Sequence, residues 1–421
     1  MAVRHRVVVI GAGFGGLRVV GGLRNAPVDV TIVDAHNFHT FQPLRYQVAT
    51  AGLDTDDIAY PVRGIFRRQH NVSVRMASVT GFELDARRVL TDRGDPLEYD
   101  TLVIAAGSVT DDFGTPGVAE FGFPLKSAAD AVALRNHLLT QFEDAALTGE
   151  IGAGALDVVV CGGGPTGVEM AGGLVELYQR VLAKDFPDLD VAAARVTLVE
   201  AADQVLGSFH DELGKRARRT LAKRGVDVIT STPVSQVELD AVHLADGRAI
   251  PTRTVVWAAG VRANPLATLL GVTLGRGGRI LVAPDLTVPG HHEVFAIGDI
   301  AIDPTSPLPQ VAQPAIQGGR HVARQIVRRL DGQSTESFHY RDKGSMATIG
   351  RHDAVAEFSN GFRLGGPLGW LAWLGLHIVY LMGFRNRANV LVNWTWNYLT
   401  YDRASRLLAT DDDFVTRSTR R

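Results

Sequence analysis

The fold is decided by VVVIGAGFGGL at residues 7–17 and by VVVCGGGPTGVEMAG at residues 158–172. Each stretch runs from β-branched residues through glycines into an apolar pattern of helical period, which is the strand–turn–helix context of a dinucleotide-binding fingerprint. A single G-x-G-x-x-G arises easily by chance. Two of them, about 150 residues apart, indicate two bound dinucleotides, as in a flavoenzyme that takes electrons from a nicotinamide.

The composition limits the classes of protein that fit. A chain of 421 residues is long enough for two or three domains with real cores. Lys and Arg (43) nearly balance Asp and Glu (45), so we expect no nucleic-acid partner. The single cysteine, Cys161, excludes an internal disulfide or a redox-active cysteine pair, and we expect no metal site. The polar N-terminal MAVRHR is unlike a signal peptide, so we expect the catalytic part in the cytoplasm.

The first fingerprint predicts a turn between a buried strand and a helix. Gly11 allows the tight turn, Gly13 lets the backbone approach a pyrophosphate, and Gly16 lets the helix pack on the strand. The next strand, VDVTIVD (28–34), ends in Asp34, 23 residues after Gly11. That offset is close to the one expected of an acid that accepts ribose hydroxyls.

A late G-D decides between FAD and NAD at this first site. VFAIGDIA (294–301) places Asp299 directly after a strand. It resembles the second flavin contact of the two-dinucleotide-domain flavoproteins, in which the Asp meets the ribityl chain. YDTLVIAAGS (99–108) is similar to the strand by which such chains leave the flavin domain. The resemblance implies FAD at the first site.

The second fingerprint repeats the design with Gly162, Gly164 and Gly167. The acid that ends the following strand is Glu200, 38 residues after Gly162, and residues 176–194 account for the extra length as an extended helix plus a loop. A carboxylate here accepts from a free 2′-hydroxyl and repels a 2′-phosphate, and no Arg follows it directly. We expect NADH rather than NADPH.

Four stretches carry a more specific resemblance. They are HNFHTFQPLRYQVATAGL (36–53), GGGPTGVEMAG (162–172), AQPAIQGGRHVA (312–323) and FHYRDKGSMATIG (338–350). Together they are similar to type II NADH dehydrogenases, more narrowly to a bacterial, actinobacterial-like branch. The resemblance implies a single-subunit, non-proton-pumping NADH:quinone oxidoreductase of the respiratory chain, with menaquinone favoured. Disulfide reductases and sulfide:quinone reductases both need more than one cysteine, and this chain has only Cys161.

The resemblance also implies roles for individual residues. Those expected to contact FAD are Gly11, Gly13, Phe14, Gly15, Gly16, Asp34, Gln42, Gln47, Gly107, Asp299 and Ala312. Those expected to contact NADH are Gly162, Gly164, Pro165, Thr166, Gly167, Glu200 and Gly260. Gln313 and Gln317 would lie where the quinone head docks, and Glu169 would carry protons, because reduction to quinol consumes two. The alternatives are a packing face for both glutamines and a helix-start acid favoured by the dipole for Glu169.

The C-terminal part suggests a membrane contact. Residues 365–384 carry no formal charge and precede Arg385 and Arg387; their length is the minimum for a transmembrane helix, but internal glycines, a histidine and a proline disfavour that. One helical stripe is aromatic, with Trp370, Trp373, His377, Tyr380 and Phe384. Another is aliphatic, with Leu371, Leu374, Ile378 and Leu381. A second helix would present Leu391, Trp394, Tyr398 and Tyr401.

These stripes suit a helix that lies in the membrane plane, with aromatic residues at the headgroups and aliphatic ones in the acyl chains. A dimer interface or a core helix fits the pattern equally well. The family resemblance favours the peripheral anchor on the cytoplasmic face. Homodimers are common in that family, but the sequence identifies no interface.

We therefore expect an α/β protein with two Rossmann-like, doubly wound domains. The FAD domain would comprise residues 1–112 and 266–330, interrupted by an NADH domain at 125–262 and followed by an amphipathic, helical membrane module at 335–421. Two alternatives stay open. A soluble NADH-dependent reductase of a ferredoxin or rubredoxin shares both glycine sites, and a non-enzymatic flavoprotein could sense NADH through a partner.

Overall fold

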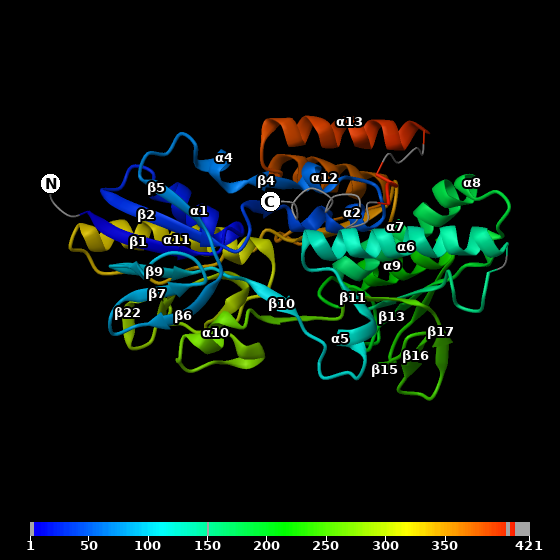
Figure 1. Ribbon diagram of the computed structural model, residues 1–421, viewed down its shortest axis with the longest axis horizontal. Helices are drawn as coiled ribbons and strands as arrows, with labels where there is room; N and C mark the ends of the chain where they lie inside the picture. The colour runs from blue at the N-terminus through cyan, green and yellow to red at the C-terminus, as the bar shows by residue number, and fades with distance from the viewer. Residues whose placement is uncertain (1–3, 150, 401–404, 409–421) are drawn as a thin grey trace, which may run out of the picture. The chain divides into compact units, whose positions relative to one another are not determined.

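The computed structural model describes residues 4–149, 151–400 and 405–408 (Figure 1). Contacts within the chain divide it into two compact units, and each consists of three separate stretches of sequence. Unit 1 is formed by Met1–Thr40, Ala59–Thr110 and Val261–Lys343. Unit 2 is formed by Phe41–Ile58, Asp111–Gly260 and Gly344–Arg421.

A six-stranded sheet forms the centre of unit 1, in the order β21-β22-β9-β1-β2-β5. All neighbouring pairs are parallel except β21 with β22. The strands are β1 (His5–Ile10), β2 (Val28–Asp34), β5 (Val72–Met76), β9 (Thr101–Ile104), β21 (Thr287–Val288) and β22 (His291–Ala296). This order brings strands from all three stretches of unit 1 side by side. It confirms four strands that the sequence predicts in this unit: the one before Gly11, the one that ends at Asp34, the one within residues 99–108 and the one before Asp299.

Two helices of unit 1 pack closely, α1 (Phe14–Gly22) and α11 (Ala312–Leu330). Glycine permits the approach, because a Cβ on Gly319 would lie 2.4 Å from the carbonyl oxygen of Gly15. The smaller elements are β3 (Phe38–Thr40), β4 (Ala59–Pro61), α4 (Val62–Phe66), β6 (Val79–Glu83), β7 (Arg88–Thr91), β8 (Leu97–Glu98), β10 (Ser108–Thr110), β19 (Val261–Ala263), α10 (Leu266–Leu269), η4 (Arg276–Gly278), β20 (Ile280–Leu281), η5 (Gly298–Ile300) and β23 (Ala301–Ile302).

Unit 2 has a five-stranded sheet of its own, in the order β11-β18-β12-β13-β14, with every pair parallel. Its strands are β11 (Gly122–Pro124), β12 (Val158–Cys161), β13 (Val196–Val199), β14 (Val226–Ile229) and β18 (Thr254–Trp257). A smaller antiparallel sheet contains β15 (Val234–Val237), β16 (Ala241–Leu244) and β17 (Ala249–Pro251). The strands β12 and β13 confirm the two that were expected, one before Gly162 and one before Glu200.

The helices of unit 2 include the extended segment expected after the second fingerprint. There α7 (Pro165–Leu177) continues through a π-helical turn, η2 (Tyr178–Leu182), into α8 (Ala183–Asp185) before a loop. The other helical elements that precede residue 344 are η1 (Gln42–Leu44), α2 (Arg45–Ala49), α3 (Thr55–Ile58), α5 (Val118–Phe121), α6 (Ala128–Thr148), η3 (Val191–Ala193) and α9 (Asp211–Arg224). The helix α6 begins with a capping box between Ser127 and Asp130.

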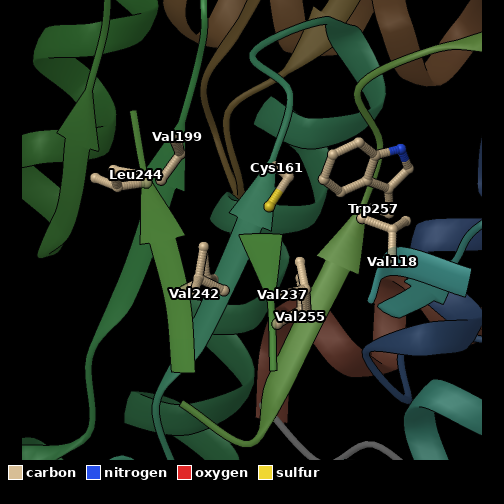
Figure 2. Close-up of a cluster of buried hydrophobic side chains, with 9 residues drawn as sticks. Val118, Cys161, Val199, Val237, Val242, Leu244, Val255 and Trp257 are labelled. Atoms are coloured by element: carbon tan, nitrogen blue, oxygen red, sulfur yellow. The ribbon is translucent and has the colours of Figure 1, made fainter. Parts of the chain in front are cut away.

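Cys161 ends β12 and belongs to the apolar core of unit 2 (Figure 2). Its neighbours in the cluster include Val255 and Trp257 of β18 and Val199 of β13. Burial raises the pKa of the thiol to about 12, so the group stays neutral. Cys161 is therefore a small, packed core residue.

The C-terminal part of unit 2 begins with a sheet that the sequence did not predict. Three antiparallel strands, β24 (Ser345–Thr348), β25 (Ala354–Glu357) and β26 (Arg363–Gly365), precede α12 (Gly366–Tyr380) and α13 (Phe384–Thr400). The two helices contact each other (Figure 1). Neither these helices nor any other in the described residues is long and apolar enough to cross a membrane.

The predicted aromatic stripe is wrong in two respects. The chain leaves the helix at Leu381, and Arg387 donates to the carbonyl oxygens of Val379 and Leu381, so Phe384 begins a new helix. Trp373 and His377, which stack with ring centroids 3.9 Å apart, are buried rather than placed at a headgroup level.

The aliphatic stripe is only partly correct. Leu371 is exposed, as are Leu368, Leu376 and Val379, whereas Leu381 is buried. On α13 the predicted face divides in the same way, because Leu391 is half exposed and Trp394 is buried. Tyr401 lies outside the described residues. Helical spacing showed which residues share a face of each helix, but not which of these residues pack against the rest of the protein.

We expect Cys161→Ser to lower the free energy of unfolding by about 1–3 kcal/mol, because it buries a hydroxyl among apolar side chains. Cys161→Ala is the matched control and should cost about 1 kcal/mol through lost packing alone. Urea denaturation of both variants measures the difference. Equal stability of the serine variant and the unsubstituted chain would contradict this description of the core.

Candidate functional site

The first glycine turn has the backbone that its residues predict. Gly11 adopts φ +99°, a conformation that side chains rarely tolerate. A Cβ on Gly16 would lie 1.9 Å from the carbonyl oxygen of Gly11, so only glycine lets the helix start this close to the turn. A Cβ on Gly13 would meet nothing within 4 Å. The turn thus leaves open space beside the start of α1.

Asp34 is fixed at the end of β2 by two backbone donors. Its carboxylate accepts from the amide of Ala12 at 2.7 Å and from that of His36 at 2.8 Å. The first of these donors lies between the two leading glycines of the turn. The carboxylate is therefore held beside the turn, with remaining lone pairs available for hydroxyls.

The second turn repeats this arrangement in unit 2. Gly162 adopts φ +108°, and a Cβ on Gly167 would lie 1.8 Å from the carbonyl oxygen of Gly162. Glu200 accepts from the amide of Gly163 at 2.5 Å and from that of Ala202 at 2.7 Å. The extra length before Glu200 does not alter the geometry, because it lies in η2, α8 and the loop beyond.

Both helices that follow the turns begin without a side-chain cap. The N-cap residues are Gly13 for α1 and Gly164 for α7, and a Cβ on Gly164 would also meet nothing within 4 Å. The backbone amides at these helix starts therefore remain open to an anion. Pro165 occupies the first position of α7, where its missing N–H costs little, and Thr166 beside it is exposed. The two turns fit the pyrophosphates of two dinucleotides.

Asp299 has a partner that the sequence reading missed. It lies in η5 after β22, and its carboxylate accepts from the hydroxyl of Ser108 at 2.6 Å. Gln310 donates to the carbonyl oxygen of Asp299 at 3.0 Å. Gly107, with φ +70° and open space beside it, precedes this serine. Ser108 ends the motif YDTLVIAAGS, so the signal was present.

His39 was also missed at the first turn. It is buried, its Nδ1 lies 2.9 Å from the carbonyl oxygen of Ala12, and its ring meets Phe14 edge to face at 5.2 Å. Burial lowers the pKa of His39 and favours the neutral ring. Its effect is to fix the conformation of the turn next to Gly13. The residues HNFHTF quoted for the resemblance contain it.

The two glutamines of α11 lie one turn apart and contact each other. Gln317 donates to Gln313 at 3.4 Å. The amide of Gln317 also forms a reciprocal pair with the backbone of Arg341, at 2.9 and 3.0 Å. These contacts support the packing alternative for Gln317, whereas Gln313 is half-buried. Ala312 is the first residue of α11. Gly318 faces Leu286 and Ile297, an apolar site with no polar contact.

Glu169 lies inside unit 2 and is not an exposed helix-start acid. Its side chain on α7 is buried and accepts from the amide of Thr348 at 3.2 Å. Burial raises its pKa to about 8, although the Thr348 amide favours the charged form. The Trp373 indole also favours that form, but its N–H falls short of hydrogen-bond geometry. The group can therefore hold a proton at neutral pH.

Gln47 on α2 makes protein contacts at both ends of its amide. Its oxygen accepts from the indole of Trp394 at 2.8 Å, and its nitrogen donates to the Tyr46 hydroxyl at 3.0 Å. That hydroxyl lies 3.1 Å from the hydroxyl of Thr348. These partners come from three distant parts of the sequence, and of them only Tyr46, in the YQVAT segment around Gln47, was expected near the flavin.

The remaining predicted residues divide between the two units. Gln42 begins η1 in unit 2, where its carbonyl oxygen accepts from Arg45, and Gly260 follows β18 beside the ring of Phe113. Unit 1 contains the predicted FAD residues Gly11, Gly13, Phe14, Gly15, Gly16, Asp34, Gly107, Asp299 and Ala312. Among the described residues, no group of three or more His, Cys, Asp or Glu could hold a metal ion.

Two family models match the chain. The model of the pyridine nucleotide-disulphide oxidoreductases matches residues 5–319, and that of the NDH2 C-terminal domain matches residues 343–401. The first match includes both glycine turns and both carboxylates. The second includes β24–β26, α12 and α13.

Curated relatives agree with these models. Type II NADH:quinone oxidoreductase NdhA of Mycobacterium tuberculosis is 42% identical, over 94% of this chain and 87% of its own length. The enzyme Ndh of the same organism is 40% identical, over 99% and 92%. A type II NADH:quinone oxidoreductase of Staphylococcus aureus is 34% identical, over 84% and 89%.

A solved structure has the same fold. NDH2 from Plasmodium falciparum in complex with NADH superposes with a TM-score of 0.88 and covers 97% of this chain and 100% of that one, at 18% identity. The sequence relatives, the two family models and the fold agree, and the chain is an oxidoreductase that belongs to the type II NADH:quinone oxidoreductase family.

Proposed function

We propose that this protein oxidises NADH and reduces a membrane quinone, with non-covalently bound FAD as the electron carrier and without proton pumping. The observation that carries the proposal is the pair of equivalent glycine turns. In each turn, the backbone amide between the first two glycines donates to the carboxylate at the end of the next strand, Asp34 or Glu200. Nothing in the sequence supplies a cysteine pair that could accept the electrons. The acceptor is therefore external.

NADH is the dinucleotide of the second turn. The amides at the start of α7 face its pyrophosphate, and Glu200 accepts from the ribose hydroxyls. The backbone donors on Glu200 use one side of each carboxylate oxygen and leave lone pairs free. A 2′-phosphate would meet this fixed negative charge. Residues 125–262 form the NADH domain.

FAD belongs to the first turn, in a domain of residues 1–112 and 266–330. Gly13 and the start of α1 would hold its pyrophosphate. Asp34, which the Ala12 amide fixes, would hold the adenosine ribose, and Asp299, which Ser108 fixes, would hold the ribityl chain. FAD would supply the redox chemistry that links a hydride donor to a quinone. The chain contributes binding and orientation, with Ser108 and Gln310 fixing Asp299. Gln42, Gln47, Gly107 and Ala312 complete this proposed set.

Glu169 is the proposed proton carrier. Reduction of a quinone to a quinol needs two protons, and this acid keeps its proton at neutral pH because burial raises its pKa to about 8. An ordinary surface glutamate would have lost the proton. Gln313 is the proposed contact of the quinone head, and Gln317, whose amide pairs with the backbone of Arg341, donates to Gln313 from one turn further along α11. Menaquinone is the favoured substrate because of the resemblance to actinobacterial enzymes.

The exposed side chains of α12 and α13 form the proposed membrane surface. On α12 they are Leu368, Leu371, Leu376 and Val379, and on α13 they are Phe384, Leu391, Val392 and Trp396. Exposed apolar residues on two adjacent helices suit the interface of a bilayer, and Arg385 beside them suits anionic headgroups. We place the protein on the cytoplasmic face as a peripheral protein. A homodimer stays a prediction.

We expect Glu200→Ala to raise the KM for NADH by roughly tenfold or more, because a charge-assisted hydrogen bond to the ribose is lost. The preference for NADH over NADPH should narrow. The exposed Asp203→Ala variant is the matched control and should change neither quantity. Steady-state kinetics with both nucleotides measure this. An unchanged preference in the Glu200 variant would remove Glu200 from the ribose role.

We expect the free energy of unfolding to depend on pH through Glu169. The folded protein keeps this proton up to about pH 8, whereas an unfolded chain releases it near pH 4.5. Stability should therefore fall between these values by up to about 1.4 kcal/mol per pH unit, and this fall should stop above the folded pKa. Glu169→Gln should abolish that component, whereas Glu120→Gln at an exposed site should not. Urea denaturation at several pH values measures this. The same pH dependence of the free energy of unfolding in both variants and in the unsubstituted chain would refute the assignment.

Anaerobic stopped-flow absorbance tests the proposed function directly. The flavin-loaded protein is reduced with NADH and then mixed with menaquinone in liposomes or with a short-chain quinone in solution. We expect fast re-oxidation by both. The variant L371Q/V379Q should lose about tenfold or more of the liposome rate but keep the solution rate, because apolar area no longer enters the bilayer.

The control is Leu239→Gln, which changes an exposed leucine outside α12 and α13. It should behave as the unsubstituted chain in both assays. Absence of re-oxidation by any quinone, with fast transfer to a ferredoxin or rubredoxin, would establish the soluble reductase instead. Slow transfer to every acceptor would favour a sensor of NADH.

A further inference from the structure

A chain of side-chain hydrogen bonds joins α13 to the strand beside Glu169, within unit 2. It runs from the Trp394 indole to Gln47 at 2.8 Å, from Gln47 to the Tyr46 hydroxyl at 3.0 Å, and from there to the Thr348 hydroxyl at 3.1 Å. Thr348 in turn donates its backbone amide to Glu169 at 3.2 Å. The buried side of α13, at Trp394, and the buried acid are thus connected through a continuous set of contacts.

The chain has one direction, and Trp394 sets it. An indole N–H can only donate, so the oxygen of the Gln47 amide must face it. The amide nitrogen of Gln47 then faces Tyr46 and donates to the phenol oxygen. The hydroxyl hydrogen of Tyr46 is thus not needed for Gln47 and is available to the Thr348 hydroxyl, 3.1 Å away. Without the indole, the Gln47 amide could turn over and accept from Tyr46 instead.

The side chains that form this chain of hydrogen bonds are mostly buried. Trp394, Tyr46 and Thr348 are all buried, and burial raises the pKa of Tyr46, so the phenol keeps the hydrogen that it donates. The same residues line a cavity of about 50 Å³, which has room for water. Trp394→Phe removes the indole N–H and keeps an aromatic ring beside this cavity.

We infer that Trp394 is a positioning residue for Glu169: it orients Gln47 so that Tyr46 donates to Thr348 and fixes the backbone amide that holds the acid. The inference rests on the proposed role of Glu169 as proton carrier. It gives α13 a second role beside membrane contact. Loss of the indole N–H should loosen the amide, leave the carboxylate less stabilised and shift its titration to higher pH.

Other titratable groups lie on the elements packed against Glu169. They are Tyr46 of α2, Glu176 of α7 with its ion-pair partner Arg351, His377 of α12 and Tyr398 of α13. Burial lowers the pKa of His377 to about 4 and raises that of Tyr46, so neither changes charge near neutral pH. The Arg351–Glu176 pair, at 3.1 Å, also lines the cavity, and Arg351 donates to the carbonyl oxygens of Asn397 and Tyr398 rather than to the side chains that the variants below change.

The test compares Trp394→Phe with Thr395→Val, which removes an exposed hydroxyl from the same helix. Stopped-flow is recorded from acid to alkaline pH for reduction by NADH and for re-oxidation by a short-chain quinone in solution. We expect W394F to slow re-oxidation several-fold and to move its pH profile to higher pH, with reduction by NADH unchanged. T395V should match the unsubstituted chain. A W394F profile that coincides with that of T395V would overturn the inference.

Tyr46→Phe provides a second route, should W394F retain too little flavin. It removes the hydroxyl itself and should produce the same shift. The double variant W394F/Y46F should then shift no further than either single variant, because both act through one chain. Additive shifts would overturn the inference.

Glu169→Gln separates this inference from the proposed function. If E169Q re-oxidises at the normal rate with an unchanged profile, Glu169 is not the proton carrier and the proposed function loses that step. If E169Q abolishes the pH dependence while W394F leaves it unmoved, only the role of Trp394 fails.

Discussion

The rest of the structure depends on one close approach of backbone to backbone. In each unit the third fingerprint glycine lies against the carbonyl oxygen of the first, with no room for a Cβ at Gly16 or Gly167. This contact starts the helix immediately beside the end of its strand. The helix amides then face the open space at Gly13 and Gly164, and the carboxylate of the next strand reaches the residue between the leading glycines. A dinucleotide site follows from that single constraint.

Such local constraints explain what could be predicted. Gly11 needs its positive φ whatever surrounds it, and a strand of β-branched residues must end before it. Asp34 and Glu200 both end the strand next to a turn, so their positions follow from parallel pairing even though the second offset is much longer. Cys161 could be placed in the core because it ends the apolar run VVVC.

Other features depend on contacts between residues far apart in the sequence, and no local pattern announces them. The spacing of Trp373 and His377 revealed a stripe, but a stripe does not indicate whether lipid or protein covers it, and here protein does. The indole of Trp394 meets Gln47 across more than three hundred residues of sequence. Ser108 and Asp299 lay in quoted motifs, yet their hydrogen bond emerges only when the sheet brings β9 beside β22.

The C-terminal segment has a second part in the proposed function, besides contact with a membrane. Thr348 of β24 donates to Glu169, Trp373 of α12 lies next to the same carboxyl, and Tyr46 reaches α13 through Gln47. The unusual pKa of Glu169 arises from burial, and β24 and α12 provide part of the cover. Removal of this segment would expose the acid, return its pKa toward that of an ordinary glutamate, and leave it ionised at neutral pH. In the proposed function, the exposed apolar residues of this segment contact the membrane, and its buried residues keep the proton that the quinone needs.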